Sequence, residues 1–104
     1  MSRGPDAATL LERALLAAAD AAGCPVAVVA SDWTRWASAT FTGARHSLTL
    51  TTAAGPRLDR WLVGLSEAEF GLRNYLLADL VVTRMCREGD RVTVALEALT
   101  VEER

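Results

Sequence analysis

The last third of the chain contains two long β-prone segments joined by a tight turn, and this pair constrains the fold more than any other feature. The segment LRNYLLADLVVTRMC, residues 72–86, is followed by REGDR and then by VTVALEALTV, residues 92–101. Gly89 and Asp90 suit the two central positions of a type II′ turn, because glycine readily adopts the positive φ that the first position requires. The sequence therefore predicts a long antiparallel hairpin.

Counting back from this turn assigns each hairpin residue to a face, since successive strand side chains alternate. Glu88 then lies opposite Arg91 as an oppositely charged pair. One face is mostly apolar and carries Val81, Thr83, Met85, Val92, Val94, Leu96 and Ala98. The other face is mixed and carries Leu80, Val82, Arg84, Cys86, Thr93, Ala95, Glu97 and Leu99. Arg84 and Glu97 are diagonal neighbours there, and a slip of one residue would exchange the two faces.

The mixed face bears on the oligomeric state, because Leu80, Val82 and Leu99 make it partly apolar. A sheet with apolar side chains on both faces needs cover on both sides. A second helix over part of that face would provide cover. A homodimer packed through the sheet or its edge would do so as well, and this is the interpretation that we favour.

The N-terminal third predicts a helix over residues 7–22, preceded by a short flexible tail over residues 1–5. Asp6 is a suitable N-cap, and Gly23 followed by Pro25 ends the pattern. The apolar stripe recurs at helical spacing and consists of Leu11, Ala14, Leu15, Ala18 and Ala22.

A second helix is expected after Pro56, a favoured first helical residue. Its stripe is formed by Leu58, Trp61, Leu62 and Leu65. Ser66 and Glu69 resemble a capping box, which would add a further turn ending near Gly71.

Between the two helices the sequence predicts two strands, from VAVVA at residues 26–30 into DWTRW, and from Ala39 to Thr52. Gly43 leaves two alternatives open, a bulge within the second strand or the tip of a hairpin that would give a fifth strand. The order α-β-β-α-β-β indicates one α+β domain spanning residues 1–104. It would have two layers, the long N-terminal helix packed on a curved antiparallel sheet of four, or five, strands.

The composition narrows the function classes. All eleven basic residues are arginine, as expected from a GC-rich bacterial genome, and they are spread along a chain of net charge −2. A concentrated basic face is missing, which argues against nucleic-acid binding. The apolar runs are far shorter than a bilayer span, and MSRGPD has no signal-peptide character, so we expect a cytoplasmic protein without a membrane partner. Cys24 and Cys86 are expected to be reduced thiols, and the sequence predicts neither a metal nor a cofactor.

Asp79 is the most unusual residue, because it interrupts the apolar run YLLADLVV. A carboxylate there is costly unless it is paired or hydrogen-bonded. It is either a site carboxylate with a raised pKa, or a structural residue that pairs with an arginine such as Arg35, Arg45 or Arg73 or that lies at the wet end of the strand.

His46 is the only histidine and the natural candidate for acid–base chemistry at neutral pH. Asp79 would orient it if their strands are neighbours and their side chains share a face. The alternative is a structural histidine on a strand.

The aromatic pair Trp33 and Trp36 flanks Arg35 and has the composition of a ligand-stacking platform. On an uninterrupted strand the two rings point to opposite faces, so that one would pack under a helix and the other at an edge or interface.

The backbone conformation at Gly43 decides which face of the sheet the later residues of the second strand occupy. A bulge at Gly43–Ala44 would turn Phe41, His46, Leu48 and Leu50 toward the core and Arg45 outward.

The sequence thus supports two hypotheses. The first is a non-catalytic homodimeric interaction or ligand-binding module. The alternative is a small enzyme or ligand-binding domain with a pocket between helix and sheet lined by His46 and Asp79. The candidate ligand-binding residues are His46, Asp79, Arg45, Arg84, Trp33 and Trp36, and no catalytic residue is assigned.

Overall fold

The structure, a computed structural model, confirms the predicted α-β-β-α-β-β order and α+β class. It describes residues 6–103, so that the predicted tail over residues 1–5 lies outside it. The elements are α1 (Ala7–Ala21), β1 (Ala27–Ala37), β2 (Thr42–Ala53), α2 (Pro56–Leu65), β3 (Tyr75–Glu88) and β4 (Arg91–Glu102).

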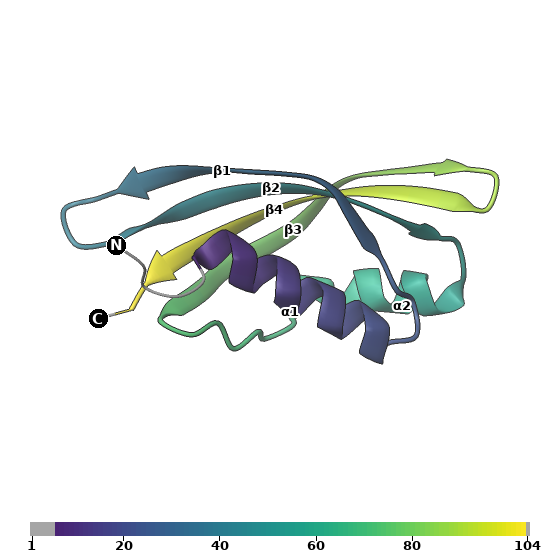
Figure 1. Ribbon diagram of the computed structural model, residues 1–104, viewed down its shortest axis with the longest axis horizontal. Helices are drawn as coiled ribbons and strands as arrows, with labels where there is room; N and C mark the ends of the chain where they lie inside the picture. Colours follow the sequence, from purple (N-terminus) through teal and green to yellow (C-terminus); the bar gives the residue numbers. More distant parts are fainter. Residues whose placement is uncertain (1–5, 104) are drawn as a thin grey trace.

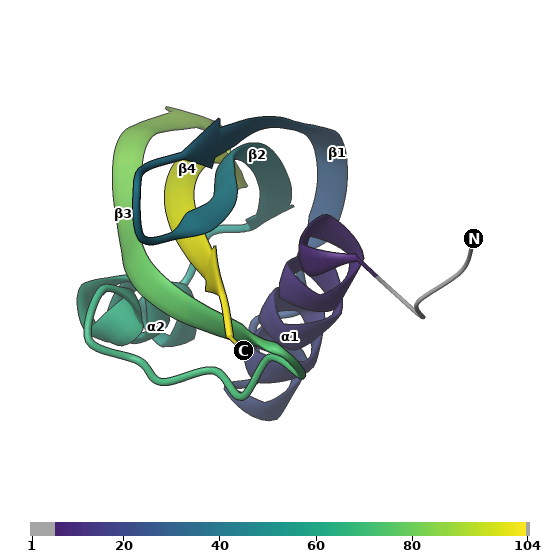
Figure 2. The same ribbon diagram turned by 90° about the vertical axis from the view of Figure 1, so that its left-hand side faces the viewer.

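The four strands form one antiparallel sheet in the order β1-β2-β4-β3, which places β2 and β4 in the centre and leaves β1 and β3 as edges. The sheet is strongly twisted, and the β1–β2 and β3–β4 turns project from opposite ends of a molecule 46 Å long (Figure 1). Both helices lie on the same side of the sheet, beneath its arch (Figure 2). One sheet face therefore packs on helices and the other does not.

The core lies between the helices and the face that we call the inner face. The two central strands supply alternating buried side chains, and α1 and α2 supply leucine and alanine from their apolar stripes. The principal members are Leu11, Leu15, Ala19, Leu48, Leu50, Leu58, Leu65, Val92, Val94 and Leu96. These residues are apolar at period two in the strands and at helical spacing in the helices, which is why the element types follow from the sequence.

Both helix starts follow the expected chemistry. The Asp6 side chain accepts a hydrogen bond from the Thr9 amide at 2.9 Å, which satisfies a free donor of the first turn of α1. Pro56 begins α2. The further turn expected after Ser66 is wrong, because α2 ends at Leu65 and only turn hydrogen bonds follow, including Glu67 N to Gly64 O at 3.2 Å.

The β3–β4 hairpin has the predicted turn, with Gly89 at φ +63° and Glu88 opposite Arg91. The predicted faces hold from Arg84 to Glu88 and are wrong before that. Register irregularities between Val82 and Arg84, and again between Leu77 and Asp79, each insert one residue into β3.

The first insertion reverses the parity of the residues that precede it. Leu80 and Val82 consequently pair with Ala98 and Leu96 on the inner face, and Val81 moves to the other side, opposite Glu97. Two of the three apolar residues on which the argument for a dimer through the outer face rested are therefore on the helix side.

Neither alternative for Gly43 is correct. Gly43 lies within β2 and pairs with Trp36, while the loop between the strands spans residues 38–41. β2 runs without a bulge, and the irregularity falls instead in β1 at Val29. His46 and Arg45 still face inward and outward as predicted, but Phe41 lies before β2 in the exposed loop.

A glycine is needed at position 43 for a different reason. A Cβ there would overlap the carbonyl oxygen of Thr100 on the neighbouring strand, and it would crowd the indole nitrogen of Trp36 at 2.9 Å. Gly43 thus permits a close approach of backbone and ring.

Candidate functional site

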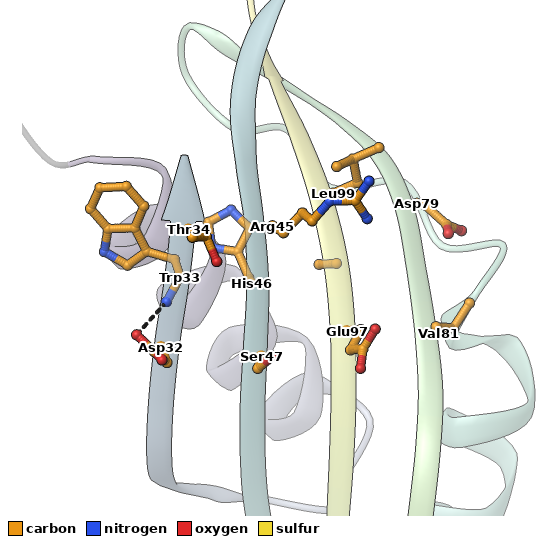
Figure 3. Close-up of a pocket in the computed structure, with 11 residues that line it drawn as sticks. Asp32, Trp33, Thr34, Arg45, His46, Ser47, Asp79, Val81, Glu97 and Leu99 are labelled. Atoms are coloured by element: carbon orange, nitrogen blue, oxygen red, sulfur yellow. Dashed lines mark hydrogen bonds between the residues drawn. The ribbon is translucent and has the colours of Figure 1, made fainter. Parts of the chain in front are cut away.

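A groove on the open face of the sheet collects polar side chains from all four strands (Figure 3). This outer groove has a volume of about 250 Å³. Two cross-strand rows form it, Thr34–Arg45–Leu99–Asp79 and Asp32–Ser47–Glu97–Val81, in the strand order β1-β2-β4-β3. The groove therefore contains three carboxylates and one guanidinium. Residues between the rows, including His46 and Ala98, also border the groove, although strand alternation assigns their side chains to the inner face.

Arg45 lies near the centre of this charge pattern. Its side chain extends from β2 across β4 in the direction of Asp79 (Figure 3). Leu99 and Asp79 are the next two residues along the same cross-strand row, so that the guanidinium lies over an aliphatic side chain on its way to a carboxylate. The positive charge is placed within the acidic groove.

The two outermost carboxylates each cap a backbone amide on an edge strand. Asp79 accepts a hydrogen bond from Leu80 N at 3.1 Å on β3, and Asp32 accepts one from Trp33 N at 2.9 Å on β1. Both amides belong to edge strands, where the side away from the sheet has no strand partner. Asp79 is thus an exposed, backbone-bonded residue of the outer face, which explains how a carboxylate is tolerated in YLLADLVV.

A second, smaller cavity lies on the inner face beside the N-terminus of α1. This inner cavity has a volume of about 120 Å³. Its lining combines buried groups with more accessible ones and consists of Asp6, Ala7, Ala8, Trp33, Arg35, Ala44, His46, Tyr75, Thr100 and Glu102. Ala7, Ala44, His46 and Thr100 are buried, whereas Asp6, Trp33, Arg35 and Glu102 are exposed. The cavity therefore has an enclosed floor and an open mouth.

His46 is held on that floor by Thr100. The imidazole is 3% exposed, and its Nε2 lies 2.9 Å from Thr100 Oγ1. The same Oγ1 lies 3.5 Å from the Ala44 carbonyl oxygen. The Thr100 hydroxyl is therefore shared between the imidazole and the Ala44 carbonyl, and the tautomer of the ring sets which of the two receives the hydroxyl proton.

Burial lowers the pKa of His46 below 6.5, since the charged imidazolium is poorly solvated there, and the Asp6 carboxylate opposes this effect. Hydrogen bonds from Thr9 lower the pKa of Asp6 in turn. At neutral pH the site therefore holds a neutral imidazole near an ionised carboxylate.

The proposed dyad of His46 and Asp79 does not form. His46 pairs with Ala98 on the inner face, whereas Asp79 pairs with Leu99 on the outer face, and β4 separates their strands. The cavity between helix and sheet is lined by His46 but not by Asp79. The inserted residues in β3 set the face of Asp79, and no spacing pattern in the sequence reveals them.

The other four candidates are divided between the two faces. Trp33 borders the outer groove and the inner cavity from edge strand β1 and is 50% exposed. Trp36 is on the outer face, so that the two rings lie on opposite faces, as strand parity predicted. The indole nitrogen of Trp36 is the one enclosed side-chain N or O atom that lacks a hydrogen-bond partner within residues 6–103. Arg45 lines the outer groove. Arg84 is exposed on the outer face opposite Ala95, outside that groove.

Sequence reasoning missed several lining residues. Asp32, Ser47 and Glu97 in the outer groove, and Tyr75 and Glu102 in the inner cavity, come from strands whose mutual register was unknown. Charge alternating with small or apolar residues along each strand was a signal for an open face, but it did not show which residues are neighbours across strands.

A third hollow, the end groove, lies where the β1–β2 loop approaches β3 and the end of β4. It has a volume of about 450 Å³ and is lined by Thr40, Phe41, Leu76, Val101, Glu102 and Glu103. Phe41 is 53% and Leu76 55% exposed. The groove is therefore apolar with a carboxylate rim.

The part of the chain that the structure describes contains no group of three or more His, Cys, Asp or Glu side chains placed to hold a metal ion. None of its helices is long and apolar enough to cross a membrane. Cys24 is buried, which raises the pKa of its thiol, and Cys86 is exposed; neither forms a disulfide.

Comparison with known proteins finds no matching family model, no matching curated protein and no matching solved structure.

Proposed function

We propose that this protein is a non-catalytic binding module whose outer groove binds a cationic segment of a protein partner. The observation that carries the proposal is the set of carboxylates on the open sheet face, Asp32 on β1, Glu97 on β4 and Asp79 on β3, around the single guanidinium of Arg45. The face is uncovered by helices and polar enough to remain solvated without its partner, as suits an interaction that forms and dissociates.

The charge balance selects the sign of the partner. With three carboxylates and one guanidinium, the groove repels anions and attracts cations when all four groups are ionised. Arg45 would then set the orientation of the partner, because its guanidinium repels the cationic side chains of the partner while the three carboxylates attract them.

The non-catalytic part of the proposal is supported by the position of the single histidine. Its ring is buried, with Nε2 hydrogen-bonded to Thr100 Oγ1 and with a pKa lowered by burial, and Asp79 lies on the opposite face of the sheet. The free thiols of Cys24 and Cys86 support a reducing, cytoplasmic setting.

The test is binding of a short arginine-rich peptide by the full chain, measured by titration calorimetry at low and moderate salt. We expect Glu97→Gln to weaken binding several-fold, because an exposed groove carboxylate is lost. Glu67→Gln, which removes an exposed carboxylate just after α2, is the matched control and should leave the affinity unchanged. Equal losses in both variants, or no binding by the wild type, would contradict the proposal.

We further propose that the module is a homodimer that associates through the end groove. The support is the exposure of Phe41 and Leu76 on either side of Val101, at a place where no element covers them. An isologous contact would bring Glu102 and Glu103 of two copies together, so that added salt should strengthen the dimer by screening their repulsion.

Sedimentation velocity over a range of concentrations tests this part. Leu76→Asp should shift the protein to monomer, whereas Val63→Asp should not, although Val63 on α2 is even more exposed, at 82%. A wild-type protein that stays monomeric at high concentration and high salt would remove the dimer from the proposal.

A further inference from the structure

The three carboxylates of the outer groove are not equivalent, and the difference bears on the shape of the partner. Arg45 extends across β4 toward Asp79, so that this carboxylate is already faced by a cation of the same chain (Figure 3). Asp32 and Glu97 lie in the other cross-strand row, on either side of Ser47, and all three of these residues are exposed. The pair left to face a partner is therefore Asp32 and Glu97.

The spacing of this pair follows from the register of the sheet. Asp32 is opposite Ser47, and Ser47 is opposite Glu97, so that one strand lies between the strands of the two carboxylates. Neighbouring strands lie about 4.8 Å apart, which places the Cα atoms of Asp32 and Glu97 about 9.6 Å apart. The line that joins these two residues runs across the strands and not along them.

The separation of the pair distinguishes between the backbone conformations that a partner segment could have. An extended strand places residues i and i+2 on one face about 6.7 Å apart. An α-helix is about 10 Å across, so it would also cover the neighbouring row, about 6.7 Å away, and bring its cations against Arg45. A polyproline II segment has three residues per turn and a rise of about 3.1 Å, which places residues i and i+3 on one face about 9.3 Å apart. Of the three conformations, polyproline II matches the separation of the carboxylates.

Two further side chains of the groove suit such a segment. Ser47 has a small, exposed side chain, and the carbonyl groups of a polyproline II backbone can accept from its hydroxyl because they form no internal hydrogen bonds. Trp33 borders the groove at the β1 edge and is 50% exposed, which offers an aromatic surface of the kind on which proline-rich segments pack. Both residues favour a narrow segment that contains proline.

We propose that the cationic partner crosses the strands of the sheet as a polyproline II segment, with arginine side chains three positions apart that bind Asp32 and Glu97. This inference rests on the proposed function of the outer groove, and it specifies the conformation of the partner and the spacing of its charges. Arg45 confines the segment to the row of Asp32, because its guanidinium repels cations that lie over the other row.

The test uses three peptides of identical composition, made of arginine and proline. The first, Pro-Pro-Arg-Pro-Pro-Arg-Pro-Pro, has its arginines three positions apart, the second has them two apart, and the third has them adjacent. Titration of the full ¹⁵N-labelled chain, followed through its amide shifts, gives the three affinities at one ionic strength. We expect the first peptide to bind about threefold to fivefold more tightly than the others, the factor that one additional exposed ion pair supplies. Its shifts should follow the row of Asp32, Ser47 and Glu97.

Three variants show whether the carboxylate pair sets this preference. Glu97→Gln leaves one carboxylate of the pair and should abolish the preference for the first peptide. Asp79→Asn should weaken binding of all three peptides equally and retain the preference, because its loss leaves Asp32 and Glu97 in place. Glu67→Gln, which lies outside the groove, should change neither the affinities nor their ratio.

The peptides also separate this inference from the proposed function. Equal affinities, tighter binding of the second peptide, or a preference that persists in Glu97→Gln would overturn the inference and leave the proposed function in place. Binding of a longer arginine-rich peptide without binding of any of the three would overturn it as well. If the longer peptide also fails to bind, the proposed function fails and the inference fails with it.

Discussion

Arg45 and His46 are adjacent in the sequence and lie in opposite environments. Arg45 is exposed in a groove with three carboxylates, and its charge is solvated. His46 is buried on the floor of the inner cavity, where desolvation lowers its pKa and one ring nitrogen is fixed by Thr100. The comparison shows that one strand presents two different environments. The outer face carries charges that water screens, whereas the inner face holds a buried imidazole in a less polar setting.

The largest difference between the faces should appear in stability when neighbouring residues of β2 are truncated. Leu50→Ala removes a fully buried side chain from the core and should lower the free energy of unfolding by about 3 kcal/mol. Thr51→Ala, one residue later on the outer face, should cost well under about 1 kcal/mol. Urea unfolding of both variants checks this; similar losses would mean that the outer face is covered in solution.

The next effect concerns Gly43, the glycine at which β2 closely approaches Thr100 of β4. Gly43→Ala should destabilise the protein by about 2 kcal/mol, because the new Cβ overlaps the Thr100 carbonyl and displaces the strand that holds His46. Gly64→Ala in α2 is the matched control. Its Cβ meets nothing within 4 Å, and the change should stabilise the helix by about 0.5–1 kcal/mol. Thermal unfolding of the two variants should therefore shift in opposite directions.

Lowering the pH should reduce the free energy of unfolding through His46 on the inner face, and Arg45 on the outer face should not contribute. The pKa of His46 is lowered in the folded state, so that below pH about 6.5 the unfolded chain binds more protons than the native one. The stability due to a neutral His46 is present above that pH and is lost as the pH falls from it toward the folded pKa. In His46→Gln this part of the pH dependence should disappear, while Arg45→Gln should retain it. Urea midpoints between pH 8 and pH 5 provide the measurement, and an unchanged profile in His46→Gln would contradict the assignment.

The smallest effect is expected at the capped edge of the outer face. Asp79→Asn should change stability by less than about 0.5 kcal/mol, because the residue is exposed and an amide oxygen still accepts from Leu80 N. Asp79→Ala frees that edge amide and should increase concentration-dependent association. Light scattering of the two variants distinguishes loss of the charge from loss of the cap.

Much of the fold was predictable because local patterns agreed with it. The Asp6 cap, the Pro56 start, the Gly89 turn and the pairing of Glu88 with Arg91 each follow from local chemistry and are all present. The face of His46 was also predicted, although the bulge invoked for it at Gly43 does not exist.

The site was less predictable, and β3 shows the reason. An extra residue in an edge strand costs little locally and has no clear signature, yet it reverses the face of each residue between it and the next irregularity. For this reason the predicted faces of Leu80 and Val82 were wrong, and the environment of Asp79 could not be decided from the sequence. Lining residues such as Glu97 and Glu102 depend in addition on how β2, β3 and β4 align.

The sequence by itself determined the element order, the class of the sheet and the residues of the central strands that enter the core, because burial of apolar side chains at fixed periods is a local property. Only the tertiary structure decided that His46 and Asp79 are separated by the sheet and that Asp79 caps its own edge. It also decided that the imidazole contacts Thr100 and lines the same cavity as the N-terminus of α1. Those relations depend on register between strands far apart in the chain, and register is set by the whole packed sheet.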